Sequence, residues 1–260
     1  MSFEIISPSH LTCDALTALL HNEIGAVRIP NFVSANFCRS ATAGIKAHGI
    51  GFYDNVHPRV GRIGITQNEH KNRPDGKLEY FEKVVNAHEL RKRILQESGD
   101  CLTFVMDFLQ SLWEGKVGLA FEEDLQKFYF AGLVRVIHRA LLHFDWAQWD
   151  ARGWDIERIS AQLSWNIYLQ TGLVGGATRI YQRLWQESDE VYRIPGSYGY
   201  DTTFIRDCES VTLYPEPGEL VLFNSRNFHE VEQTEGEEER ITISSFIGWL
   251  ESTNQLVFWS

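Results

Sequence analysis

The spacing of hydrophobic and polar residues changes about midway along the chain. Between Leu11 and about Gly115, apolar residues recur mostly at helical intervals. Thr12 is a helix-capping residue type, and Leu16, Leu19 and Leu20 follow it at positions that share one helical face. The pattern predicts a helix after Thr12, a second from 34 to 48, and a third long helical stretch over 80–113 with a break near Gly99.

From about Val134 onward, β-branched and aromatic residues gather into short runs bounded by Gly, Pro and Asn. This arrangement is typical of an antiparallel β-protein. The runs predict strands at 135–139, 162–169, 177–181, 210–214, 219–223, 229–233 and 240–249.

Helices first and strands second predict an α+β fold, in which helices cover one side of a β-barrel or jelly roll. A chain of 260 residues, without repeats or a Pro/Gly/Ser linker, is consistent with one domain. We therefore expect a single domain over 1–260. Residues 1–130 would form a mainly helical support and lid, and residues 131–250 the β-barrel core.

The net charge of -11 argues against a protein that binds nucleic acid, because phosphate backbones require clustered Lys and Arg. No apolar run approaches the length of a membrane span, and the first residues lack a secretory pattern. The four cysteines are widely separated and form no Cys-x-x-Cys pair. We expect a cytoplasmic protein, a monomer or homodimer, that acts on a small molecule without a membrane or nucleic-acid partner.

A candidate metal site begins in the run Leu-Leu-His-Phe-Asp-Trp at 141–146. His143 and Asp145 are two residues apart on a strand-like segment, so both side chains point to the same face. His229 opens another predicted strand much later in the chain. Two His and one carboxylate on a β scaffold form the facial triad that holds non-haem Fe(II) and leaves positions open.

Arg240 follows His229 across a turn at 233–239 that is rich in Glu. A hairpin there would lay the Arg240 strand beside the His229 strand and direct the guanidinium into the same cavity. Its planar set of donors suits a bidentate contact with a carboxylate, such as the distal carboxylate of 2-oxoglutarate.

The His-x-Asp pair, the distal His and an Arg about ten residues beyond it resemble the Fe(II)/2-oxoglutarate dioxygenase superfamily. The segments YLQ…GGATRIY at 168–181 and PGELVLFNS ahead of His229 share this resemblance. Length and layout are most similar to the small freestanding amino-acid and natural-product hydroxylases and their halogenase relatives. The resemblance implies a double-stranded β-helix, a jelly-roll fold of cupin type, with Fe(II), 2-oxoglutarate and O2 as cofactor and cosubstrates. It covers about 134–249.

Radical halogenases of this group have Gly or Ala where the carboxylate ligand stands, which leaves a coordination position for chloride. Asp145 fills that position here. The resemblance therefore implies hydroxylation of an unactivated C–H bond with conversion of 2-oxoglutarate to succinate and CO2. Desaturation, epoxidation and ring formation remain open, because the sequence does not place the substrate relative to the metal.

Further candidates come from the alternation within the predicted strands. Asn166 and Tyr168 share one polar face of their strand, which either lines the active site or faces solvent. Thr242 and Ser244 share a face with Arg240. We expect Asn166, Tyr168 and Thr242 to contact 2-oxoglutarate. The residues expected to approach the substrate are Trp146, Ser244, Trp249 and Arg62. Arg62 lies in a long loop over 51–64, which is either a lid over the substrate or an ordinary surface loop.

Two other functions fit the same residues. A protein or peptide hydroxylase would need an open groove in place of a closed pocket. A non-catalytic β-barrel protein would use the histidines for another metal or for none, but it would have little reason to place Arg240 beside them. The substrate itself is not identified by the sequence.

Overall fold

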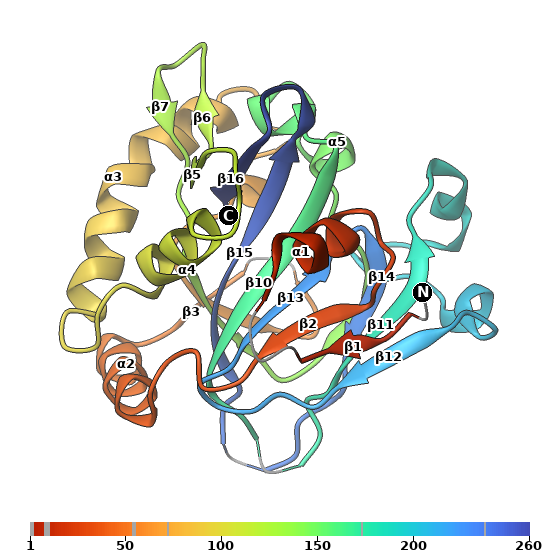
Figure 1. Cartoon of the computed structure of the whole chain (residues 1–260), viewed down its shortest axis with the longest axis horizontal. Helices are drawn as coiled ribbons and strands as arrows, with labels where there is room; N and C mark the ends of the chain where they lie inside the picture. Colours follow the sequence, from red (N-terminus) through yellow and green to blue (C-terminus); the bar gives the residue numbers. More distant parts are fainter. Residues whose placement is uncertain (1–2, 8–10, 54–55, 72, 173, 237) are drawn as a thin grey trace.

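The computed structural model describes residues 3–7, 11–53, 56–71, 73–172, 174–236 and 238–260. Its larger sheet has the strand order β1-β2-β13-β10-β15-β8-β4-β3, and β16 pairs with both β15 and β5 (Figure 1). Most neighbours are antiparallel, whereas the pairs β1–β2 and β16–β5 are parallel. These strands are β1 (Ile5–Ile6), β2 (Ala26–Ile29), β3 (Gly51–Phe52), β4 (Val60–Ile63), β5 (Val117–Leu119), β8 (Leu133–Ile137), β10 (Ala161–Gln170), β13 (Leu220–Asn224), β15 (Ile241–Leu250) and β16 (Gln255–Trp259).

A smaller antiparallel sheet has the order β12-β11-β14-β9. It consists of β9 (Ala140–His143), β11 (Thr178–Leu184), β12 (Ser210–Leu213) and β14 (Asn227–Val231). One hydrophobic cluster joins the sheets, since it combines Tyr168, Val221 and Phe223 of the larger sheet with Ile180 and Leu213 of the smaller one. The inner faces of both sheets therefore meet, as in the predicted double-stranded β-helix.

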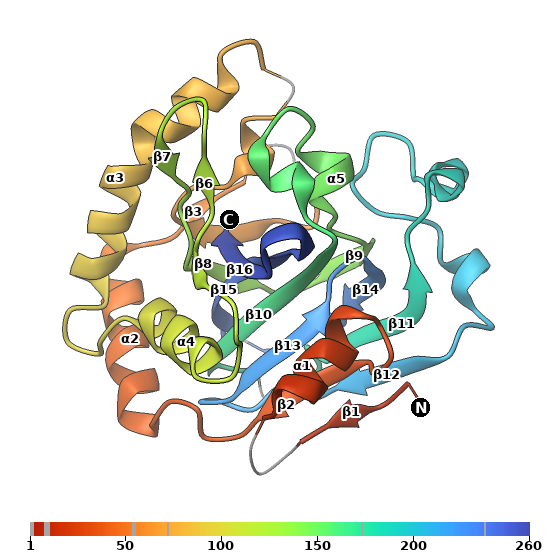
Figure 2. The ribbon, with the colours of Figure 1, turned by 45° about the horizontal axis from the view of Figure 1, so that its top comes forward.

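Helices cover the outer face of the larger sheet, as Figures 1 and 2 show. Helices α1 (Cys13–Leu20) and α2 (Ala35–His48) both contact β10, while α4 (Cys101–Gln110) contacts β5. Helix α3 (Gly76–Ile94) packs beside α2 and the short hairpin of β6 (Phe121–Glu122) and β7 (Lys127–Phe128). The predicted cap Thr12 accepts a hydrogen bond from a first-turn N–H, and Ser34 does the same at the start of α2. The predicted long third helix is broken, as expected, between Ile94 and Cys101.

Short helical segments complete the chain. They lie between the longer elements and do not contribute to the sheets. They are α5 (Ala147–Asp150) and the 3-10 turns η1 (Gln67–Glu69), η2 (Asp155–Arg158), η3 (Glu187–Tyr192), η4 (Thr202–Ile205) and η5 (Glu251–Thr253).

Alternate residues of β10 point to opposite faces of the sheet, one toward the helices and the other toward the space between the two sheets. Leu163, Trp165 and Ile167 belong to the cluster that packs against the helices. The intervening residues face the space between the sheets, where Tyr168 joins the inter-sheet cluster. The α+β fold class and this strand assignment confirm what the hydrophobic pattern predicts.

The predicted hairpin between the His229 and Arg240 strands is wrong. β14 pairs with β9 and β11 in the smaller sheet, whereas β15 pairs with β10, β8 and β16 in the larger one. The connecting turn is held by other partners, since Thr234 donates its N–H to His138 and Glu235 donates to Val174. Glu237 of this turn lies outside the described residues. The chain thus crosses from one sheet to the other at this point.

Residues 1–130 contribute short strands to the larger sheet in addition to their helices. β2 pairs with β13, and β4 pairs with β8, so the N-terminal half extends both sides of the larger sheet. Val60 and Ile63, read as part of a loop, lie in β4 and are buried. Strands of two to four residues leave too little sequence for an alternating pattern to show. Asp54 and Asn55 of the predicted lid lie outside the described residues.

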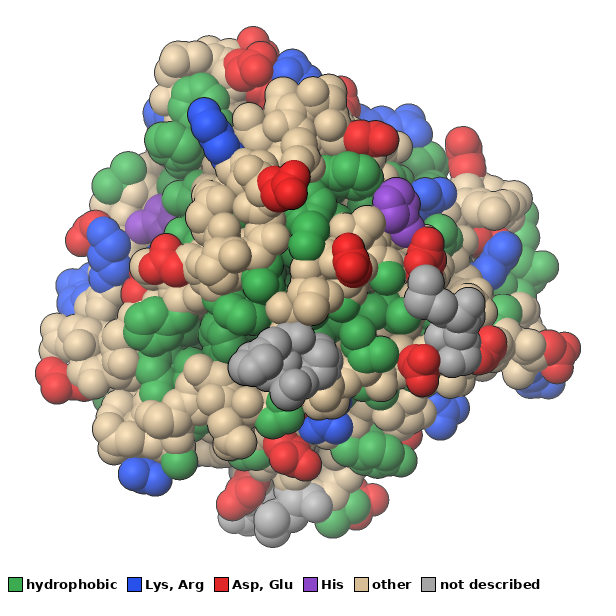
Figure 3. All heavy atoms as spheres, viewed as in Figure 1, with side chains coloured by type: hydrophobic (Ala, Val, Ile, Leu, Met, Phe, Trp, Pro, Cys, Tyr) green, Lys and Arg blue, Asp and Glu red, His purple; other side chains and the backbone are tan. Residues whose placement is uncertain are grey.

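The face of the molecule seen in Figure 3 carries charges of both signs. Lys and Arg side chains are scattered there among Asp and Glu, without a continuous basic patch. In the part of the chain that the structure describes, no helix has both the length and the apolar character needed to cross a bilayer.

Candidate active site

The smaller sheet brings the two histidines of the predicted metal site together. In the antiparallel register of β9 and β14, His229 is directly opposite His143. Asp145 follows β9 by two residues and is fixed by its backbone, because its N–H donates to the carbonyl of Ser225 at 2.8 Å. The Ser225 hydroxyl in turn donates to the carbonyl of Asp145 at 3.3 Å. Pairing of main-chain groups therefore brings His143 and Asp145 together with His229, which is distant in the sequence.

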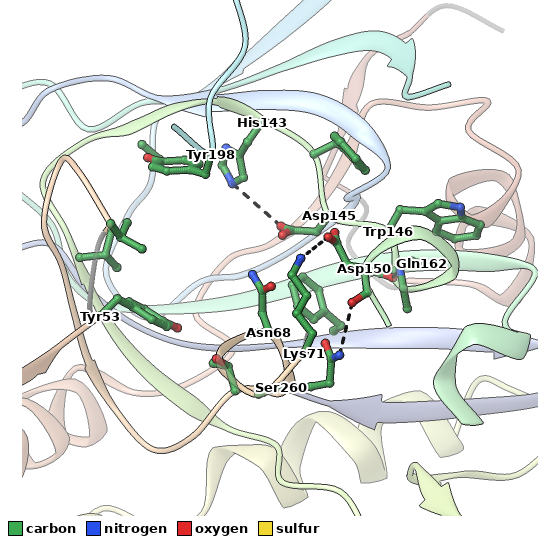
Figure 4. A pocket seen from close by; sticks show the side chains of 18 of the residues that line it. Tyr53, Asn68, Lys71, His143, Asp145, Trp146, Asp150, Gln162, Tyr198 and Ser260 are labelled. Carbon is green, nitrogen blue, oxygen red and sulfur yellow. Dashed lines mark hydrogen bonds and ion pairs between the residues drawn. The ribbon is translucent and has the colours of Figure 1, made fainter. Parts of the chain in front are cut away.

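The three side chains converge on one point. The Asp145 Oδ2 atom lies 3.9 Å from His143 Nε2 and 3.7 Å from His229 Nε2. The two imidazole ring centres are 4.2 Å apart, and Figure 4 shows His143 pointing toward Asp145. Among the described residues, these form the cluster of His, Cys, Asp or Glu with the proximity needed to hold a metal ion.

The hydrogen bonds of both histidines leave the correct nitrogen free for a metal. His143 Nδ1 lies 2.7 Å from the carbonyl of Leu141, and His229 Nδ1 lies 2.8 Å from the carbonyl of Asn227. A carbonyl only accepts, so each Nδ1 carries the proton and each Nε2 presents its lone pair. Burial, reinforced by His143, lowers the pKa of His229 well below its ordinary value. The neutral ligand form is therefore favoured, and the residues fit a divalent metal bound by two imidazoles and one carboxylate.

Arg240 lies at the start of β15 and is buried between the sheets, with 3% of its surface exposed. Its Nη2 atom donates to Thr178 Oγ1 at 3.2 Å and to Tyr168 Oη at 3.4 Å, and its guanidinium lies 5.0 Å from the centre of the Tyr168 ring. Its Nε and the hydroxyl of Thr242 have no hydrogen-bond partner among the described residues. Burial lowers the pKa of Arg240. A buried guanidinium without an acidic partner, next to an unpaired hydroxyl, fits a bound carboxylate.

The main chain of the smaller sheet leaves room for this guanidinium at Gly176. This glycine has φ +76°, and a Cβ added there would lie 2.9 Å from Thr234 Cγ2 and 3.3 Å from Arg240 Cδ. Close packing against Thr234 and Arg240 therefore explains the second glycine of the GGATRIY segment, Gly176. A larger residue would push on the side chain of Arg240.

A cavity of about 230 Å³ opens beside the cluster (Figure 4). His143, Asp145 and the predicted substrate residue Trp146 line it. The loop expected to act as a lid contributes Tyr53 and Val56 to its wall. Other lining residues are Lys71, Arg135, Asp150, Gln162, Tyr198 and Phe246.

The structure decides between the two orientations of the polar face on β10. Gln162 lines the cavity, and Tyr168 lies in the cluster between the sheets. Asn166 is paired with Ser244, and Tyr168 with Thr242, across the neighbouring strand. The four residues expected to contact cosubstrate or substrate from these strands therefore face the interior. Thr242 and Ser244 are both buried, and neither hydroxyl has a partner among the described residues.

Two predicted substrate residues are placed away from the cavity. Arg62 pairs with Glu69 and also donates to the carbonyl of Gly64 at 2.9 Å. Trp249 packs at the outer face against Trp113, and its indole N–H donates to Asn254. Neither residue lines the cavity.

Several lining residues are not identified by reading the sequence. Tyr198 lies edge-on to His143, with ring centres 5.6 Å apart, and its hydroxyl accepts the N–H of Leu141 at 2.9 Å. Lys71 and Asp150 form an ion pair across the cavity although they are 79 residues apart. No spacing connects such residues. Arg135 has a local signal, since it interrupts an apolar strand between the buried Val134 and Val136.

Comparison with known proteins agrees with this geometry. The family described as carrier-protein-independent halogenase WelO5 matches residues 6–260. "Leucinostatins biosynthesis cluster protein S" of Purpureocillium lilacinum is 40% identical over 80% of this chain and 88% of its own. "L-gamma-glutamyl-L-propargylglycine hydroxylase" of Streptantibioticus cattleyicolor is 25% identical over 100% of this chain and 97% of its own.

Solved structures show the same fold. A crystal structure of an N-substituted L-amino acid dioxygenase from Burkholderia ambifaria AMMD has a TM-score of 0.67 and 16% identity, and the match covers 96% of this chain and 92% of that one. Together with the family match and the curated relatives, this confirms the predicted recognition of an Fe(II)/2-oxoglutarate-dependent oxygenase, an enzyme. Within that superfamily, the chain belongs to the family of the carrier-protein-independent halogenase WelO5.

Proposed function

We propose that this enzyme uses Fe(II), 2-oxoglutarate and O2 to hydroxylate an unactivated C–H bond of a small amino-acid or peptide-derived molecule. His143, Asp145 and His229 would hold the iron, and Arg240 with Thr242 and Tyr168 would bind the distal carboxylate of 2-oxoglutarate. The iron would supply the oxygen chemistry, which couples decarboxylation of 2-oxoglutarate to succinate with oxidation of the substrate. The protein places the two reactants and limits access of water.

One observation favours hydroxylation over the halogenation in the family's description. The Asp145 carboxylate lies within 3.9 Å of both Nε2 atoms, where it would occupy a coordination position. Halogenases of the group that the sequence resembles have Gly or Ala at this position, and chloride takes the place of the carboxylate. With Asp145 present, a halide has no equivalent position.

The size of the cavity favours a small substrate. Its volume of about 230 Å³ is below the range of about 300–1,000 Å³ typical of pockets for drug-sized ligands. A peptide segment of a folded protein would need an extended groove. The relatives also support this assignment, because one is a hydroxylase of L-γ-glutamyl-L-propargylglycine and another belongs to a leucinostatins biosynthesis cluster.

The compartment in which the enzyme works is inferred from its cysteines. All four cysteines, Cys13, Cys38, Cys101 and Cys208, are free thiols. Free thiols are typical of a reducing compartment, which supports a cytoplasmic enzyme. A monomer or homodimer without nucleic-acid partners remains our expectation.

The experiment that tests this function is a screen of succinate release. The iron-loaded enzyme is incubated with 2-oxoglutarate and a panel of free L-amino acids, N-acyl amino acids and γ-glutamyl dipeptides, in buffer that contains chloride. We expect substrate-stimulated succinate release and a product heavier by one oxygen atom. A chlorinated product from the unaltered enzyme would contradict the assignment to hydroxylation.

A further inference from the structure

Arg135 is a charged residue of the cavity wall that the proposed reaction does not yet use. It lies on β8 opposite Thr242 of β15, and cross-strand partners share one face of a sheet. Its neighbours Val134 and Val136 belong to the cluster packed against the helices, so Arg135 points inward. The side chain lines the cavity, and its guanidinium lies 5.8 Å from the centre of the Phe246 ring.

The guanidinium of Arg135 lacks a partner among the described residues. Its Nε atom is buried without a hydrogen bond, and no carboxylate of the described part of the chain forms an ion pair with it. A buried donor of this kind costs free energy unless a ligand or water satisfies it. The position therefore suits an acceptor that arrives with a ligand.

The other charges of the cavity are already compensated. Lys71 is paired with Asp150, and Arg193 is paired through its Nε with Glu190 at 2.8 Å. Asp145 belongs to the proposed metal site. Among the described residues, Arg135 is thus the cationic lining residue that has no carboxylate partner. Because its positive charge is not compensated, the cavity is complementary to an anionic ligand.

Arg135 and Arg240 have different surroundings. Arg240 is enclosed between the sheets by Tyr168 and Thr178, with 3% of its surface exposed. Arg135 is half-buried and lines the open cavity together with apolar side chains, among them Phe246 and Trp259. The enclosed guanidinium of Arg240 suits a cosubstrate of constant shape. The guanidinium of Arg135 in the cavity suits a ligand with a carboxylate and an adjoining apolar part.

We propose that Arg135 binds a free carboxylate of the substrate, and that the substrate is therefore an anionic amino-acid derivative or short peptide with an unblocked carboxyl end. This inference rests on the proposed function. A guanidinium presents paired N–H donors to a carboxylate, so it fixes the orientation of the substrate as well as its charge. The carboxylate anchor then selects which C–H bond lies nearest the metal site.

The test uses matched pairs of ligands. Anaerobic enzyme loaded with Fe(II) and 2-oxoglutarate is titrated with N-acetyl-L-amino acids and γ-glutamyl dipeptides, each as the free acid and as the carboxamide. Binding is followed by the change in the metal-to-2-oxoglutarate charge-transfer band. We expect the best acid to bind about 10- to 100-fold more tightly than its carboxamide, since a charged hydrogen bond is lost in the amide.

Variants separate the role of Arg135 from that of the metal site. In Arg135→Gln the preference for the acid should disappear, while addition of 2-oxoglutarate still produces the charge-transfer band. Arg135→Lys should retain part of the preference. Arg139→Gln removes the same charge from an exposed position after β8 and should keep the full preference.

Three results of the titrations with acids and carboxamides would overturn the inference. They are equal binding of acid and carboxamide, a preserved preference in Arg135→Gln, and the absence of any response to an acid across the panel. Loss of the charge-transfer band in Arg135→Gln would also reject it, because Arg135 would then serve the cosubstrate. If the unaltered enzyme forms no band at all, it is the proposed function that fails.

Discussion

His143 and His229 face each other across neighbouring strands, with ring centres 4.2 Å apart and with each Nδ1 bonded to a carbonyl two residues earlier in the chain. The same local bond at both sites turns both Nε2 atoms toward the Asp145 carboxylate. This arrangement orients the ligands before any metal binds, which makes each member of the cluster testable by substitution.

Removal of the carboxylate should abolish most turnover. In Asp145→Ala the metal would lose its only anionic protein ligand, so we expect weaker Fe(II) binding and a fall in succinate release of at least about 100-fold. Iron content after gel filtration and succinate formation measure the two effects. Asp207→Ala, which removes an exposed carboxylate, serves as control and should behave like the unaltered enzyme. Full activity of Asp145→Ala would refute the ligand assignment.

Arg240 should control 2-oxoglutarate and not iron. In Arg240→Gln we expect the KM for 2-oxoglutarate to rise by about 10- to 100-fold, because charge-assisted hydrogen bonds to its carboxylate are lost. Fe(II) affinity should change little. Measurement of the KM from succinate release, together with an Fe(II) titration, separates these quantities. If the variant loses Fe(II) affinity by the same factor as it loses apparent affinity for 2-oxoglutarate, Arg240 has a general structural role instead.

Gly176 provides an indirect test of the same site. Gly176→Ala should displace Thr234 and Arg240, raise the KM for 2-oxoglutarate and lower the free energy of unfolding by about 1–3 kcal/mol. Gly196→Ala is a matched control, because Gly196 has φ +71° but no neighbour within 4 Å of an added Cβ. It should show the backbone strain without the change in KM. If both variants have the same KM, contact with Arg240 does not matter for binding.

The pH dependence of stability should reflect His88. Burial lowers the pKa of His88, helped by the nearby positive charge of Arg91, and the imidazole lies 3.2 Å from the carbonyl of Tyr129. The unfolded chain takes up a proton near pH 6.5, whereas the folded protein resists it. Stability should therefore fall as the pH drops through about 6.5, until the lowered pKa of the folded state is reached.

The variant His88→Gln isolates this contribution. Its free energy of unfolding should decrease less than that of the unaltered protein between about pH 7.5 and pH 5.5. Denaturant titrations at a series of pH values measure the difference, and the decrease common to both proteins comes from other groups. Parallel curves for the two proteins would contradict the role of His88.

The fold and the metal cluster could be predicted because their signals lie in the sequence itself. The alternation of apolar and polar residues predicts the longer strands. The His-x-Asp pair and the distal His identify the three residues whose side chains converge on the proposed metal site. The hairpin expected between the His229 and Arg240 strands is absent, because the Arg240 strand lies in the other sheet. Both sheets face one interior, so the guanidinium reaches that space without the hairpin.

The rest of the cavity depends on long-range packing. Lys71 pairs with Asp150, and Tyr198 approaches His143, through contacts between segments that share no sequence pattern. The net charge of the chain is -11, whereas the cavity carries the positive Arg135, which has no carboxylate partner among the described residues. Total charge describes the surface and does not determine the charge of a pocket.

The most direct test of the metal centre is an anaerobic titration with Fe(II) and 2-oxoglutarate, followed by the metal-to-ligand charge-transfer absorption. We predict that the band saturates at one Fe(II) per chain and is absent from His229→Ala. A His229→Ala variant that forms the band at the same Fe(II) and 2-oxoglutarate concentrations as the unaltered enzyme would contradict the proposed metal centre.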